Sequence, residues 1–151
     1  MKLAEALIER KSVKTKMEEV KKRIYQNAQV QEGDEPTESP SELLEELNRE
    51  TKKFEEFVIR INQTNNVAKL NNGMTIMEAL TKRDMLRYKH YIYTNLADKA
   101  TPPASRYSQR EIKFVPAVSV SELRKKADEI AKECRLLDTK IQEANWITEL
   151  L

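Results

Sequence analysis

The sequence predicts an almost entirely α-helical protein, in which long antiparallel helices form a four-helix, coiled-coil-like bundle with a minor β element. Three observations predict it. The 151 residues include only 2 Gly and 5 Pro, which leaves few positions for tight turns. Charged residues make up 34% and aromatic residues 6%, a mixture typical of long helices with solvated faces. Apolar residues recur at alternating spacings of three and four, the pattern of a coiled-coil seam.

This spacing predicts helices over residues 3–27, 42–65, 76–99 and 120–147. The apolar stripe of the first helix consists of Leu3, Ala6, Val13, Met17, Val20 and Ile24. The stripe of the fourth consists of Leu123, Ala127, Ile130, Cys134, Leu137, Ile141 and Ala144. Stripes of this kind face a neighbouring helix, because 3.5 residues per repeat keeps one face turned to it.

The second and third helices have broader apolar surfaces. The second has a stripe of Leu44, Leu47, Thr51, Phe54, Val58, Ile61 and Asn65, widened by Leu43 and Phe57. The third spreads its apolar residues around the circumference: Ile76, Leu80, Leu86, Tyr88, Tyr91, Ile92, Tyr93 and Leu96. Such a helix is either central in a bundle or holds a second interface.

Polar residues mark the helix starts. Ser41 is the expected N-cap of the second helix. Thr75 with Glu78, and Ser119 with Glu122, have the spacing of a capping box, in which each residue satisfies a backbone amide of the other.

We expect one domain over residues 1–151, with an acidic linker at 31–41 and a non-helical crossover at 101–118. The Asn72-Gly73 pair favours a small hairpin at 67–76, and a plain helix–turn–helix is the alternative. Residues 112–115 alternate in polarity and predict a strand that pairs with this hairpin or lies at an edge.

The net charge is only +2, but it is unevenly distributed. Residues 1–31 carry 8 basic and 4 acidic groups, whereas residues 32–50 carry 1 basic and 8 acidic groups. We expect these segments of opposite charge to fold back on each other. A basic surface for nucleic acid is the alternative.

No arrangement of residues indicates catalysis, so we expect a protein that is not an enzyme and needs no cofactor. Cys134 lies in the middle of an apolar stripe, where a core position is more plausible than a nucleophile. His90 is the only histidine and has no carboxylate within four residues, which argues against a metal site. Two glycines are too few for a phosphate-binding loop.

Two groups of polar residues are candidate interaction sites. Arg106, Tyr107, Arg110 and Lys113 gather in the crossover, where they could grip phosphates or stack on bases, or pair with carboxylates of neighbouring helices. The second group consists of Asn62, Asn65, Asn66, Asn145 and Trp146. We interpret Asn65 as a polar seam residue that fixes helix register, with a polar ligand pocket as the alternative.

The chain is expected to be cytoplasmic. Glu5 and Glu9 interrupt the apolar stretch that an export signal needs. No window approaches the roughly 18 consecutive apolar residues of a membrane span. A single cysteine excludes an internal disulfide.

The strings NAQVQEGDEP, RINQTN, RYSQREIKF and DTKIQEANW, in this order, resemble a family of small bacterial helical proteins often called septicolysin. The resemblance covers essentially the whole chain. It implies an all-helical fold and a bacterial source, and it assigns no catalytic residues. The label itself implies a pore-forming cytolysin.

The leading functional prediction is a non-enzymatic structural or interaction protein that forms homo-oligomers, as a dimer or a higher symmetric assembly. A protein partner is also compatible with it. The alternatives are nucleic-acid binding through the basic first helix and the 106–113 loop, and the cytolysin implied by the resemblance.

Overall fold

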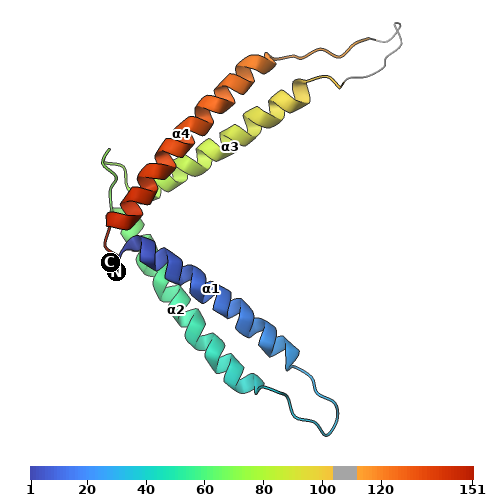
Figure 1. Cartoon of the computed structure of the whole chain (residues 1–151), viewed down its shortest axis with the longest axis vertical. Coiled ribbons are helices and arrows are strands. Elements are labelled where there is room, and N and C mark those ends of the chain that lie inside the picture. Colours follow the sequence, from blue (N-terminus) through green and yellow to red (C-terminus); the bar gives the residue numbers. More distant parts are fainter. Residues whose placement is uncertain (104–111) are drawn as a thin grey trace. The chain divides into compact units, whose positions relative to one another are not determined.

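The protein is described by a computed structural model, which covers residues 1–103 and 112–151. It contains four long helices: α1 (Leu3–Gln26), α2 (Pro40–Val67), α3 (Ile76–Ala100) and α4 (Val120–Ile147) (Figure 1). All four predicted helices are present, with ends that differ from the expected ones by at most two residues. The predicted class, mainly α with long antiparallel neighbours, is confirmed.

The chain divides into two compact units. Unit 1 contains Met1–Thr75 and Glu143–Leu151, and unit 2 contains Ile76–Gln142. Helix α4 therefore contributes its last residues to unit 1. The expectation that residues 1–151 form a single bundle domain stays a prediction.

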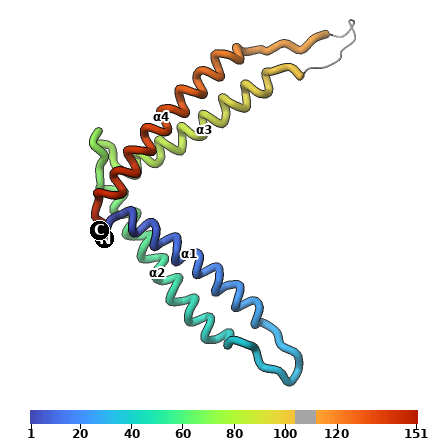
Figure 2. Tube along the Cα trace, in the orientation of Figure 1, coloured from blue at the N-terminus to red at the C-terminus, as the bar shows by residue number. Residues whose placement is uncertain are grey.

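In unit 1, α1 and α2 lie side by side and run in opposite directions (Figure 2). Lys16 pairs with Glu50, and Arg23, further along α1, pairs with Glu46, nearer the start of α2. The α1 residue further along its helix thus pairs with the α2 residue nearer the start of its helix, which indicates that the two helices are antiparallel. The α1 stripe faces α2 as predicted, with Leu3, Ala6, Val13 and Val20 buried.

The α2 seam lies one residue away from its predicted phase over part of its length. Leu43 is buried and Leu44 is exposed, although the prediction had placed Leu44 in the stripe and Leu43 beside it. Glu50 and Thr64 are buried where Thr51 and Asn65 were expected. The physical reason is that Lys16 of α1 neutralises Glu50 at 2.9 Å, so the seam tolerates a carboxylate there.

Helix α2 also begins earlier than the sequence suggested. Its N-cap is Ser39, whose hydroxyl accepts a hydrogen bond from the Glu42 amide (3.5 Å), and Pro40 occupies the first turn. Proline suits this position because its missing N–H would have had no helical partner. The predicted cap at Ser41 is therefore wrong by two residues. Helix α4 begins as expected, since the Ser119 hydroxyl accepts from the Glu122 amide (3.4 Å).

The minor β element is reduced to isolated bridges. Lys69 and Thr75 form an antiparallel bridge around a turn in which Gly73 has a φ of +84°. The minor β element predicted at 67–76 is thus a single bridge in the turn between α2 and α3. The strand predicted at 112–115 is not found in the described residues: Phe114 and Val115 are exposed and have no β partner. Alternating polarity alone does not make a strand, because the backbone also needs a neighbouring strand to pair with.

A second bridge, not predicted, joins Lys2 to Glu149 within unit 1. The Leu3 amide donates to the Thr148 carbonyl, and the Leu150 amide to the Met1 carbonyl, both at 2.9 Å. The tube in Figure 2 shows these two segments beside one another.

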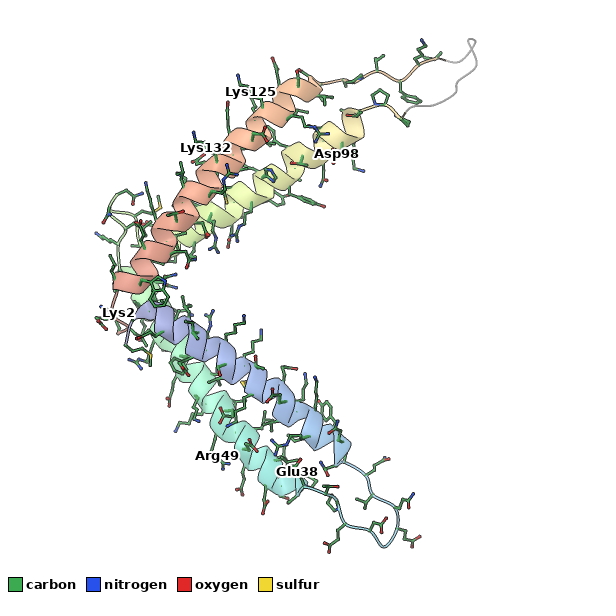
Figure 3. The ribbon with its side chains drawn as sticks, viewed as in Figure 1. Lys2, Glu38, Arg49, Asp98, Lys125 and Lys132 are labelled. Atoms are coloured by element: carbon green, nitrogen blue, oxygen red, sulfur yellow. The ribbon has the colours of Figure 1, made fainter. Side chains whose placement is uncertain are left out.

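In unit 2, α3 and α4 are also antiparallel neighbours. Arg83 pairs with Asp138 (3.1 Å), and Arg124 pairs with Asp98 (2.6 Å), which is labelled on α3 in Figure 3. The α4 stripe faces α3 as predicted, with Ala127, Leu137 and Ile141 buried. The α3 residues buried in this unit are Ile76, Ala79, Leu86 and Ala97.

Candidate interaction surface on helix α3

Helix α3 carries large apolar side chains on the face away from its buried residues. We call this face the outer stripe; it consists of Met77, Met85, Tyr88, Ile92 and Leu96. With 3.6 residues per turn, these positions lie within about 100° of one another and roughly opposite the buried face. Their exposed fractions range from 42% to 62%, so α4 and the rest of unit 2 leave this face largely uncovered.

The spacing of the outer stripe differs from that of the seams. With Thr81 included, the steps along it are four, four, three, four and four residues, so the pattern repeats every eleven residues. An eleven-residue repeat follows a nearly straight helix with a slight right-handed supercoil, whereas the seams have the heptad spacing. The outer stripe is therefore a second, geometrically separate line of apolar contacts.

The five residues of the outer stripe are all large, whereas the residues that α3 buries are a mixture of large and small side chains. Two of the four buried residues of α3 are alanines, Ala79 and Ala97. The outer stripe has no alanine. A helix usually turns its larger apolar side chains toward the core. In α3 large apolar side chains lie on the exposed face as well, and contiguous exposed apolar patches of this kind mark interaction sites.

Charged residues border the outer stripe on both sides. Asp84 and Arg87 lie on one flank, and Lys82 and Lys89 lie on the other. Lys82 contacts Glu133 of α4 at 3.6 Å, and Asp84 contacts Arg83 at 3.3 Å. Both contacts are solvent-exposed, so they contribute little to stability and their members can rearrange around a partner. An apolar centre with a charged rim is the usual composition of a protein–protein interface.

A shallow apolar cavity of about 390 Å³ adjoins the end of α3. Its lining includes Leu96 of the outer stripe, Pro102 and Pro103 after the helix, and Phe114 and Val115 of the crossover. The apolar surface therefore continues past the helix end. Sequence reasoning assigned Phe114 and Val115 to a strand and so missed this contribution.

The basic and acidic segments of unit 1 fold back on each other, as the favoured interpretation expected. Glu50 is only 4% exposed and accepts hydrogen bonds from Lys16 (2.9 Å) and Lys53 (3.2 Å). The hydrogen bond from Lys16 lowers the pKa of Glu50, burial opposes this, and Lys53 adds to the lowering. At the end of α1, the Arg23 guanidinium binds both carboxylate oxygens of Glu38, labelled in Figure 3, and lowers its pKa.

The residues predicted as a loop site are only partly described. Arg106, Tyr107 and Arg110 lie outside the described residues, and Lys113 is exposed. The structure therefore does not test whether this loop binds a ligand, and the candidate site stays a prediction.

The second predicted group is more fully described. Asn62 and Asn66 are exposed, Asn65 is half-buried, Asn145 is buried and Trp146 is exposed. All five residues belong to unit 1. Beside Asn65, the buried Thr64 hydroxyl accepts a hydrogen bond from the Leu151 amide (3.0 Å), which fixes the end of α2 to the C-terminal segment. A ligand role for the asparagines stays a prediction.

Cys134 and His90 are both half-buried on the helices of unit 2. Within residues 1–103 and 112–151, no cluster of three or more His, Cys, Asp or Glu side chains is placed to hold a metal ion. No helix in the described part of the chain is long and apolar enough to cross a bilayer.

These features define a class: an all-α protein made of antiparallel helix pairs, with an uncovered apolar face on α3. The chain belongs to a family described as "Family of unknown function (DUF6847)", whose model matches residues 10–150. A search of curated proteins gave no significant match.

One solved structure is closely similar over the whole chain. It is described as the crystal structure of a functionally unknown conserved protein from Corynebacterium diphtheriae. The two share 46% sequence identity with a TM-score of 0.92, over 100% of this chain and 99% of the other. This similarity supports the expectation of a bacterial family with a helical fold, and it says nothing about the septicolysin label.

Proposed function

We propose that this chain is a cytoplasmic, non-enzymatic interaction protein that assembles with copies of itself through helix α3. The observation that carries the proposal is the outer stripe. A soluble helix gains little from holding five large apolar side chains in water, and gains substantially when a partner covers them.

The remaining helix faces are consistent with this role. The interhelical seams of α1 with α2 and of α3 with α4 bury apolar stripe residues such as Val20 and Leu137, and the buried carboxylate of Glu50 is paired with Lys16. Pairs such as Lys16 with Glu50 are satisfied within one chain, whereas the large apolar side chains of the outer stripe remain 42% to 62% exposed.

The size of the outer stripe suits self-association. A fully exposed large side chain presents roughly 200 Å², so the five exposed fractions correspond to roughly 500 Å² per chain. Two copies together would bury roughly 1,000 Å², which is near the lower limit for a specific protein interface. Flanking side chains and the adjoining apolar cavity would add to this area.

The molar mass in solution tests the proposal. Size-exclusion chromatography with light scattering, over a tenfold range of concentration, should give a multiple of the 17.6 kDa chain mass at the upper end. Because the buried area is modest, this mass should fall toward that of one chain on dilution. A single-chain mass at every concentration would overturn the proposal.

A further inference from the structure

We infer that the outer stripe of α3 binds the same stripe of a second copy in an antiparallel, two-fold arrangement centred between Met85 and Tyr88. This inference rests on the proposed self-association and specifies the partner and geometry at that site. Two-fold pairing of one patch with itself is the commonest form of closed homo-oligomer.

The order of side chains along the stripe favours the antiparallel direction. When the centre lies between Met85 and Tyr88, these two residues face each other across the axis. Ile92 then faces the small Thr81 of the second copy, and Leu96 faces Met77. Large residues opposite smaller ones interdigitate without leaving gaps.

A parallel arrangement would place each residue beside its own copy. Tyr88 would meet Tyr88, and Thr81 would meet Thr81, so that one level would be crowded and another underfilled. Lys99, the next position of the eleven-residue pattern, would lie beside a second Lys99. Aligned helix dipoles would also repel, whereas antiparallel dipoles attract.

The charged flanks fit the antiparallel arrangement on one side. The two-fold axis places the same flank of the two copies side by side, so Asp84 of each copy lies within about one turn of Arg87 on the other. Arg87 also contacts Asp138 of its own α4 at 3.9 Å, so each Arg87 would lie between two carboxylates, which offsets the approach of the two Arg87 side chains on this flank. On the opposite flank Lys82 approaches Lys89 of the second copy, and Glu133 of α4, 3.6 Å from Lys82, offsets that repulsion.

Cross-linking of single cysteines distinguishes the two directions. At 1.5 Å per residue, the two copies of position 85 are about 5 Å apart along the axis in the antiparallel dimer, and the two copies of position 77 are about 28 Å apart. In a parallel dimer both pairs would be adjacent. The native thiol is first removed by Cys134→Ala, and Met85→Cys and Met77→Cys are each added to this background.

The expected result with a short bis-maleimide is a covalent dimer of Met85→Cys and none of Met77→Cys. Mixing Met77→Cys with Leu96→Cys should also give a covalent dimer, although neither variant cross-links alone. Light scattering of each unreacted variant verifies that it still associates.

Each other outcome has a definite meaning. Equal cross-linking of Met85→Cys and Met77→Cys would overturn the antiparallel arrangement while leaving self-association intact. No cross-linking in chains that are multimeric by light scattering would show that α3 is not the contact surface. A monomeric wild-type chain would overturn the proposed function itself.

Discussion

Leu136 and Leu137 are neighbours in α4 with opposite environments, and they provide an internal test of the helix seams. Leu137 is 8% exposed in the seam, whereas Leu136 is 58% exposed. We predict that Leu137→Ala lowers the free energy of unfolding by about 3 kcal/mol, within the range of roughly 2–5 kcal/mol for buried leucines. The cost combines lost transfer free energy with the cavity left behind.

Leu136→Ala is the matched control, because it removes the same atoms from the same helix. Alanine and leucine have similar helix propensities, so the change should stay within about 0.5 kcal/mol of wild type. For a chain of this length, 3 kcal/mol corresponds to a melting temperature lower by about 6–12 °C.

Urea unfolding followed by circular dichroism at one fixed protein concentration measures both variants. The concentration must be fixed because self-association would itself change the apparent stability. If the two units unfold separately, only the transition of unit 2 should move for Leu137→Ala. Equal losses of stability for the two variants would refute the seam assignment.

Three further predictions concern unit 1. Because the pKa of Glu50 is lowered on folding, its stabilising contribution is present above about pH 4.5 and is lost as the pH falls through the lowered value. Wild type should therefore lose stability between pH 6 and 3 more steeply than Glu50→Gln does. Parallel pH profiles of the two proteins in urea unfolding would contradict this. Ser39→Ala should cost about 0.5–2 kcal/mol by removing the N-cap of α2, and an unchanged urea midpoint would show that the cap is dispensable. Gly73→Ala should lower the free energy of unfolding by about 1 kcal/mol because φ at this turn is +84°, although the added methyl group meets no neighbour. Thermal melts should show this loss, and unchanged stability would mean that the turn relaxes.

The helices could be predicted from the sequence because their seams repeat over many turns. The stripes beginning at Leu3 and Leu123 contain six and seven apolar residues over three heptads each, so one interrupting polar residue such as Arg10 does not hide the period. The helix ends are harder to predict from the sequence, since Ser39 and Ser41 are both good N-cap residues. Only Pro40 distinguishes them, because proline favours the first helical position and so makes Ser39 the cap.

The phase of α2 could not be predicted from local pattern. Leu43 and Leu44 both fit a stripe with alternating steps, and the rule that charges face water favours Thr51 over Glu50. The outcome depends on Lys16, which lies 34 residues away in α1 and neutralises Glu50. Contacts of this kind exist only once the helices are paired.

The candidate interaction surface was predicted only in part. The sequence showed apolar residues around the whole circumference of α3, which indicated either a central helix or a second interface. Which half remains uncovered depends on how α4 is placed, and the sequence of α3 does not contain that information. The pairing of Arg83 with Asp138 assigns one face to α4 and so identifies the other as the outer stripe.

A comparison of two isoleucine variants by light scattering tests the central claim most directly. Ile92, in the outer stripe, is 44% exposed, and Ile59, on α2, is 48% exposed. At a concentration where wild type is multimeric, Ile92→Asp should have the single-chain mass of 17.6 kDa, because a carboxylate buried within the apolar interface is costly. Ile59→Asp should keep the wild-type mass. Equal masses for the two variants would contradict the assignment of self-association to helix α3.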